Sequence, residues 1–158
     1  MSGFQLQRLG QIMEPQPGNP QEVEGVLNPA AARGPDGHLY LFPRLVARGN
    51  FSRIGIARVI FNQAGDPCGV ERLGIALEPE LDYERRPDGG GGCEDPRITF
   101  VEPLRSYVMT NAARGDLGHR TGSTRYARQR TEGLLVPMQL ATRCEGEGFR
   151  GAGLLART

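Results

Sequence analysis

Several residue types are scarce or missing in this chain. Its 158 residues include no Trp and no Lys, only three Cys and two His, and just 6% aromatic residues. The cysteines, Cys68, Cys93 and Cys144, are too widely spaced for a disulfide framework or a zinc site, so we expect no bound metal and a reducing, cytoplasmic compartment. No apolar run approaches the roughly 20 residues of a membrane span, so we expect neither a signal peptide nor a membrane partner.

The charge of the chain is balanced, with 19 arginines against 18 acidic residues and a formal net charge of +1. Binding to nucleic acid depends on unopposed cations, so we expect no nucleic-acid partner and ascribe the arginines to GC-rich codons. The 23 glycines and 12 prolines predict many turns and short elements instead of long helices.

Short apolar runs separated by turn residues predict β-strands at 39–46, 54–61, 70–77, 98–101 and 107–109. Strands of this length and spacing are typical of an all-β sandwich, barrel or propeller. Residues 1–25 are polar and rich in proline, which predicts a loosely held lead-in before a β domain over 26–110. Residues 111–158 show little alternation and are predicted to form a poorly structured tail.

A glycine-rich segment holds the most distinctive chemistry. Four glycines at 89–92 precede Cys93, and Glu94, Asp95, Pro96 and Arg97 follow. Glycines allow a ligand to approach closely, and Pro96 is expected to hold Asp95 in an extended conformation. Neighbours on an extended chain point to opposite sides, so one carboxylate is expected to face a ligand and the other the scaffold.

The same residues could instead have purely structural roles. Asp95 could cap a turn, and Arg97 could pair with Glu94 or with Glu84. Arg44 follows Pro43 inside a predicted strand, which fits a bulge as well as a ligand contact. Cys93 has no histidine near it in sequence and is expected to be a packed residue. No Gly-Lys-Ser/Thr follows the glycines, which excludes a nucleotide-binding loop of that type.

An internal repeat relates two parts of the β domain. Asn28-Pro29 precedes Tyr40 as Asp95-Pro96 precedes Tyr107, and the two copies are 67 residues apart. Two copies of one sheet unit would place Asn28 and Asp95 at equivalent positions. In a propeller such positions can line the central channel.

Four motifs carry a resemblance to a known family. They are GVLNPA at 25–30, LYLFPR at 39–44, FSRIGIA at 51–57 and GCEDPRI at 92–98. In this order and spacing they resemble glycoside hydrolase family 130, the mannoside phosphorylases and related β-mannosidases. The resemblance covers roughly residues 8–110. It implies a five-bladed β-propeller, of which this chain supplies the first blade and the start of the second. Beyond residue 110 it predicts a truncated or frameshifted reading frame.

The resemblance also implies roles for individual residues. Asp95 would be the general acid, passing its proton through a sugar hydroxyl to the glycosidic oxygen. Asn28, Arg44 and Arg97 would hydrogen-bond the sugar, with Ser52 and Glu94 as further substrate-binding candidates. No cofactor is implied, and inorganic phosphate is the co-substrate if the enzyme is a phosphorylase.

The implied partner is a small oligosaccharide, and the sequence predicts no oligomeric state. Two alternatives stay open at this point. One is an inactive truncated fragment of such an enzyme. The other is a non-catalytic carbohydrate-binding module, although the chain has no Trp to serve as an aromatic platform.

Overall fold

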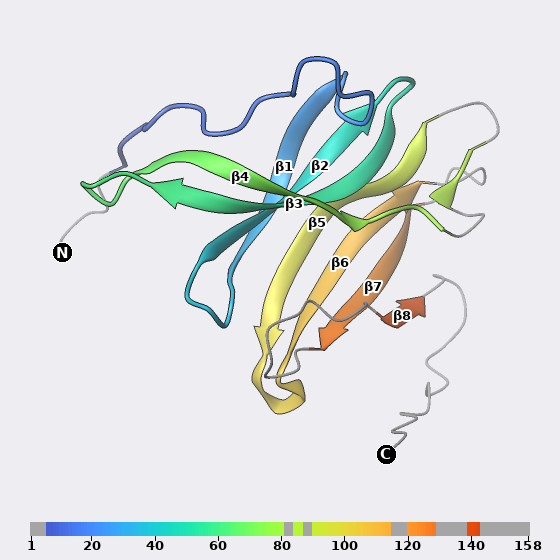
Figure 1. Cartoon of the computed structure of the whole chain (residues 1–158). Helices are drawn as coiled ribbons and strands as arrows, with labels where there is room; N and C mark the ends of the chain where they lie inside the picture. The colour runs from blue at the N-terminus through green and yellow to red at the C-terminus, as the bar shows by residue number, and fades with distance from the viewer. Residues whose placement is uncertain (1–5, 81–83, 87–89, 115–119, 129–138, 143–158) are drawn as a thin grey trace.

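The computed structural model describes residues 6–80, 84–86, 90–114, 120–128 and 139–142, and it is all-β, as expected (Figure 1). The strands are β1 (Gly25–Arg33), β2 (Leu39–Ala47), β3 (Phe51–Phe61), β4 (Pro67–Leu77), β5 (Gly91–Val101), β6 (Ser106–Arg114), β7 (Arg120–Arg128) and β8 (Gln139–Thr142). One turn of 3₁₀ helix, η2 (Glu102–Leu104), links β5 to β6. None of the helical segments described is long and apolar enough to cross a membrane.

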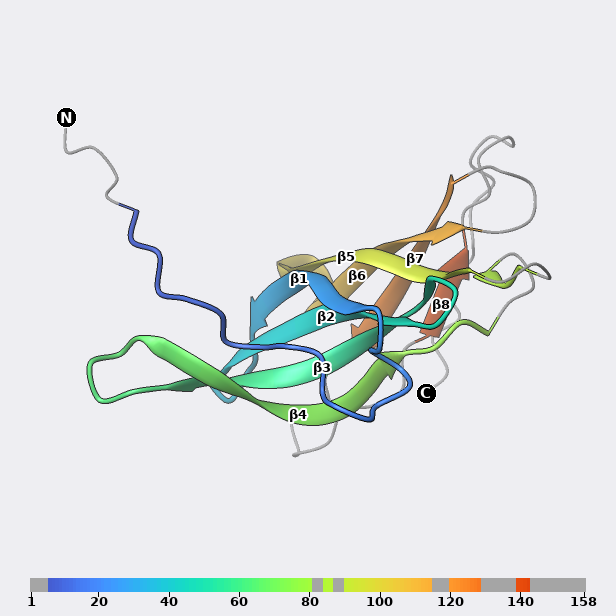
Figure 2. The same cartoon turned by 90° about the horizontal axis from the view of Figure 1, so that it is seen from above.

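The strands form two antiparallel meanders, β1 to β4 and β5 to β8, which lie next to each other in Figures 1 and 2. A short parallel pairing joins them, with Phe51 opposite Gly91 and Ser52 opposite Gly92. A four-stranded antiparallel meander is the form of a propeller blade. The second unit is therefore more complete than the sequence suggested, and the described strands do not close into a ring.

The core lies where the two meanders meet. Ile54 of β3, Leu77 of β4, Cys93 of β5 and Met109 of β6 form one cluster, each at most 3% exposed. Two of these residues come from each meander, so burying them favours the association of the meanders. Cys93 is a packed residue, as expected.

Gly92 allows the closest approach between the meanders. Its φ is +95°, and a Cβ placed there would lie 2.2 Å from the Ser52 carbonyl oxygen. No side chain fits in that space. The segment over 89–92 was expected to admit a ligand, but at Gly92 the neighbour is the backbone of Ser52.

The lead-in is tied to the first meander. Glu22 is fully buried and accepts a hydrogen bond from Nη2 of Arg72 in β4 at 3.0 Å. Glu24 binds the turn between β2 and β3 through the backbone N–H groups of Gly49 and Asn50. The expectation of a loosely held lead-in is therefore wrong for residues 22–24, whereas residues 6–10 are exposed and form no helix or strand. The polar composition of the lead-in did not show that Glu22 and Glu24 would have hydrogen-bond partners in the first meander.

The predicted poorly structured tail is also wrong in part. β6 extends through Arg114, and β7 pairs with it along its whole length, from Ser106 opposite Arg128 to Arg114 opposite Arg120. β8 pairs with β7 in turn. The remaining residues of the tail lie outside the described part of the chain. Backbone hydrogen bonds hold these strands in the ladder even though their sequences show little apolar alternation.

Candidate functional site

Asn28 and Asp95 occupy matching irregularities in β1 and β5. The β1–β2 register shifts between Leu27 and Ala30, and the β5–β6 register shifts between Glu94 and Arg97. Asn28 has φ +44° and Asp95 has φ +46°, the left-handed region that Asn and Asp tolerate better than most residues. The expectation that Pro96 keeps Asp95 extended is wrong, because the bulge imposes the left-handed conformation.

The two residues meet across the boundary between the meanders. Asn28 Nδ2 donates a hydrogen bond to Asp95 Oδ1 at 2.8 Å. Because their register shifts and φ values match, the Asn/Asp-Pro half of the repeat is a structural equivalence. The Tyr half is not equivalent. Tyr40 pairs with Ala32, four residues after Asn28, whereas Tyr107 pairs with Phe100, five residues after Asp95. The connection after β5 is one residue shorter than that after β1, which accounts for the slip.

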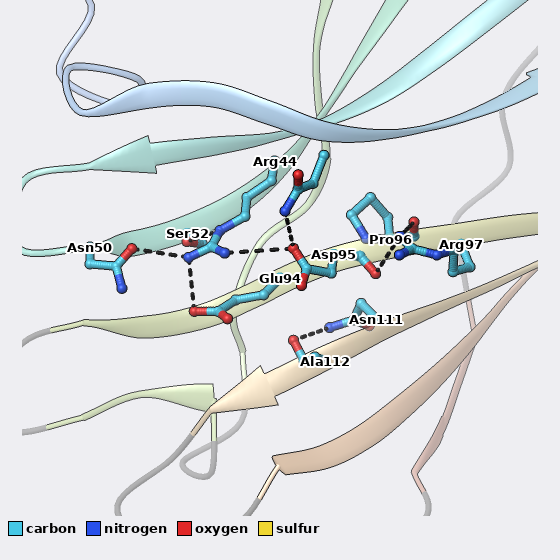
Figure 3. Close-up of polar contacts among 10 residues, drawn as sticks. Arg44, Asn50, Ser52, Glu94, Asp95, Pro96, Arg97, Asn111 and Ala112 are labelled. Carbon is cyan, nitrogen blue, oxygen red and sulfur yellow. Dashed lines mark hydrogen bonds and ion pairs between the residues drawn. The ribbon is translucent and has the colours of Figure 1, made fainter.

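Arg44 is the centre of the polar cluster in Figure 3. Its side chain is 11% exposed. Nε donates to Ser52 Oγ at 2.8 Å, and Nη2 donates to Asn50 Oδ1 and to Glu94 Oε1, both at 3.0 Å. Nη1 lies 3.6 Å from Asp95 Oδ1. The planar guanidinium therefore links the first meander to both carboxylates of the second.

Arg44 lies in a regular stretch of β2, so the alternative of a bulge at this residue is wrong. The register between β2 and β3 is the same on both sides of it, with Leu41 opposite Ala57 and Arg44 opposite Ile54. The irregularity lies on the opposite side, in β1. Pro43 faces that bulge, where its missing N–H breaks no regular ladder.

Glu94 and Asp95 have different surroundings although both reach Arg44. The Glu94 side chain is 10% exposed and forms the short ion pair, whereas the Asp95 side chain is 34% exposed. Glu94 is tied to the first meander through Arg44, and its contact with a substrate stays a prediction. The two carboxylates do not point to opposite sides as predicted, because the left-handed conformation of Asp95 interrupts the alternation of the strand.

Arg97 makes no ion pair with Glu94 or Glu84. Its Nη1 donates to the backbone oxygens of Pro96 at 2.8 Å and Asp95 at 3.4 Å, while Glu94 is paired with Arg44. Arg97 and Asn28 both line an open depression of about 480 Å³ between β1 and β5. The depression is lined by Asn28, Pro29, Ala30, Ala31, Arg97 and Ile98.

Ser52 is fully buried, and its hydroxyl accepts the hydrogen bond from Arg44. In this structure it orients Arg44, and its direct contact with a sugar stays a prediction. The sequence reasoning missed Asn50, which also holds Arg44. The signal available was the Gly49-Asn50 pair between two strands, which is typical of a turn with positive φ.

The arrangement supplies one accessible carboxyl group beside one cation. Asp95 Oδ1 receives both the Asn28 hydrogen bond and the Arg44 contact, and Oδ2 has no hydrogen-bond partner in the described part of the chain. No group of three His, Cys, Asp or Glu suitable for a metal ion occurs among the residues described. Asp95 does not itself line the depression, but it is hydrogen-bonded to Asn28, which does.

The sequence matches no family model and no curated protein. Solved structures do share its fold. One is described as part of the GH130 family of mannoside phosphorylases, which contains glycoside hydrolases that target β-1,2 mannosidic linkages in Candida mannan. It aligns with a TM-score of 0.54 at 20% identity, over 88% of this chain and 43% of its own length.

Two further structures give the same result. A glycosyl hydrolase from Bacteroides ovatus aligns with a TM-score of 0.52 at 20% identity, over 83% of this chain and 41% of its own. A candidate glycoside hydrolase from Parabacteroides distasonis aligns with a TM-score of 0.51 at 24% identity, over 72% of this chain and 36% of its own.

The chain thus spans less than half the length of each of these three structures. Identities at this level are evidence about the fold alone. The described strands have the fold of part of a glycosidase of this kind, and the resemblance to GH130 seen in the sequence is confirmed in the fold.

Proposed function

We propose that this chain supplies the acid half of a carbohydrate-cleaving site that acts on β-mannosides, with Asp95 as general acid. The observation that carries the proposal is the placement of Asp95. Its Oδ1 is held by Asn28 and faces Arg44, while Oδ2 has no hydrogen-bond partner among the described residues. The likeness to the GH130 structure supports the choice of substrate class.

In the proposed reaction Asp95 acts as the acid. Its proton passes through a sugar hydroxyl to the glycosidic oxygen as the bond from C1 to that oxygen breaks. A phosphate oxygen attacks C1 from the opposite face, which inverts the configuration and releases mannose 1-phosphate. Asn28 and Arg97, which line the depression beside Asp95, would hydrogen-bond the sugar.

The pairing of Glu94 with Arg44 makes Glu94 a poor candidate for the second carboxylate of a hydrolase. A hydrolase of the inverting type needs a second carboxylate as a base, separated from the acid by room for a water molecule. Glu94 is the carboxylate next to Asp95, but it is buried and paired with Arg44. A phosphorylase does not need that base, because phosphate is itself the nucleophile.

The test is phosphate-dependent turnover. The whole chain would be incubated with β-linked manno-oligosaccharides, with and without inorganic phosphate, and the products separated by chromatography. The proposal expects mannose 1-phosphate only when phosphate is present. Free mannose in both reactions would point to hydrolysis by the same site. The absence of both products from every β-mannoside would overturn the proposal.

One observation favours a second candidate, an inactive part of such an enzyme. The described strands form two meanders that do not close into a ring, and strand edges left unpaired promote aggregation. This candidate predicts no turnover together with concentration-dependent association. A monomer that unfolds cooperatively would count against it. Sugar binding without turnover, unchanged in Asp95→Asn, would instead indicate a carbohydrate-binding module.

A further inference from the structure

Two residues outside the predicted site act on Arg44. Asn50 Oδ1 accepts a hydrogen bond from Arg44 Nη2 at 3.0 Å. Asn50 is in turn held by Glu24, whose two carboxylate oxygens accept the backbone N–H groups of Gly49 at 2.8 Å and Asn50 at 2.9 Å. A chain of hydrogen bonds therefore runs from the lead-in, through the β2–β3 turn, to the guanidinium beside Asp95.

The hydrogen bonds of Arg44 involve Nε and Nη2, and Nη1 is left to face Asp95. Nε is bound to Ser52, and Nη2 is bound to Asn50 and Glu94. Because the guanidinium is planar, fixing Nε and Nη2 also fixes the direction of Nη1. Nη1 is the nitrogen that lies 3.6 Å from Asp95 Oδ1.

Glu24 binds the turn that carries Asn50. Asn50 has φ +59°, and Gly49 before it has φ +76°. Two successive N–H groups in such a turn form a small concave binding site for an anion, and here the anion is the Glu24 carboxylate. Glu24 is itself fixed, because its backbone N–H donates to Val46 O at 2.9 Å.

We propose that Glu24 and Asn50 are positioning residues for Arg44. Neither lines the depression between β1 and β5. Glu24 holds the turn, the turn presents the Asn50 amide oxygen, and that oxygen keeps Arg44 Nη1 directed at Asp95. The catalytic consequence rests on the proposed function, whereas the orientation of Arg44 does not.

The test follows Arg44 directly by nitrogen NMR of its side chain, with the signal assigned by its loss in Arg44→Lys. The measured quantity is the rate at which Nη1 and Nη2 exchange by rotation about the Nε–Cζ bond. Asn50→Gly keeps the positive φ but removes the acceptor, so the rotation should accelerate about tenfold, the size expected for one hydrogen bond to a charged group. Asn50→Asp keeps an acceptor and should keep the slow rate.

Glu24→Gln tests whether Glu24 acts on Arg44 through the turn that carries Asn50. Glu78→Gln serves as control, because Glu78 pairs with Arg53 and not with Arg44. Glu24→Gln should accelerate the rotation in the wild-type background and add nothing to Asn50→Gly, since it acts through Asn50. Glu78→Gln should change nothing.

Three results would overturn the inference: an unchanged rate in Asn50→Gly, equally fast rotation in Asn50→Asp, or an additive effect of Glu24→Gln. If the protein proves active, Asn50→Gly should lower kcat, with Asn50→Asp restoring it. If no β-mannoside is turned over, the proposed function fails while the NMR rates still decide the positioning role.

Discussion

Asn28 and Asp95 are 67 residues apart in sequence and joined by a 2.8 Å hydrogen bond in the fold. Each lies at a bulge, with φ +44° and +46°, and each precedes a proline. Asn28 belongs to the first meander and Asp95 to the second. The candidate site is therefore formed only when the two meanders are packed together.

Substitution of Asn28 separates the hydrogen bond from the backbone conformation. Asn28→Gly keeps the positive φ and removes the amide, so it should cost about 1 kcal/mol of unfolding free energy. Asn28→Ala should cost about 1 kcal/mol more, because alanine is disfavoured at this φ. Denaturant titration measures both values. Equal losses of unfolding free energy in the two variants would show that the positive φ of residue 28 does not disfavour alanine.

Gly92 should not tolerate a side chain. Gly92→Ala places a Cβ 2.2 Å from the Ser52 carbonyl oxygen, and the chain must shift where the meanders meet. We expect a loss of about 3 kcal/mol or a failure to fold. Gly69→Ala is the matched control, since a Cβ there meets nothing within 4 Å, and it should change stability by less than about 0.5 kcal/mol. Thermal unfolding followed by circular dichroism compares the two.

Removing the Arg44 cation should leave Glu94 as a buried, unpaired charge. Arg44→Met is expected to cost about 3 to 5 kcal/mol, and adding Glu94→Gln should recover part of that loss. Arg58→Met is the control, because the Arg58–Glu71 pair is exposed and should contribute at most about 1 kcal/mol. A double variant no more stable than Arg44→Met alone would show that the pair is not the source of the loss.

The turn between β1 and β2 should respond to pH through Asp36 and Tyr40. The Tyr40 hydroxyl donates to Asp36 Oδ2 at 2.6 Å, which lowers the pKa of Asp36 and raises the pKa of Tyr40. The stabilisation from Asp36 is therefore present above its unfolded pKa and is lost as pH falls through the lower, folded value. For Tyr40 it is present below the unfolded pKa and is lost as pH rises through the higher, folded value.

Two substitutions check this pair. Tyr40→Phe should move the Asp36 pKa up toward its ordinary value in a carboxyl NMR titration. Asp36→Asn should lower the Tyr40 pKa in an ultraviolet titration of the tyrosines. If neither pKa moves, the hydrogen bond does not persist in solution.

The sequence predicted the parts of the fold that depend on local pattern. Apolar runs between turn residues identified β2 to β6, and the repeated Asn/Asp-Pro pair identified Asn28 and Asp95 as equivalent. Local pattern could not show that β7 would pair with β6, because backbone hydrogen bonds hold a strand whose sequence shows little alternation.

The site was predicted as a set of residues but not as a network. Asn28, Arg44, Ser52, Glu94 and Asp95 are brought together, with Arg97 close by. The partner of Glu94 was not foreseen, because Arg44 is 50 residues away and reaches it only through packing of the meanders. The predicted backbone conformation of Asp95 was wrong. The residue before a proline is usually extended, but the bulge at Asp95 overrides that preference.

The most direct test of the account compares Asp95→Asn with Asp66→Asn in the phosphorolysis assay. Asp66 lies in the exposed β3–β4 turn, away from the polar cluster, so its substitution should leave the activity of the wild-type chain unchanged. Asp95→Asn cannot donate the proton and should lower the release of mannose 1-phosphate by about 100-fold or more. Equal activity in the two variants would contradict the assignment of Asp95 as the acid.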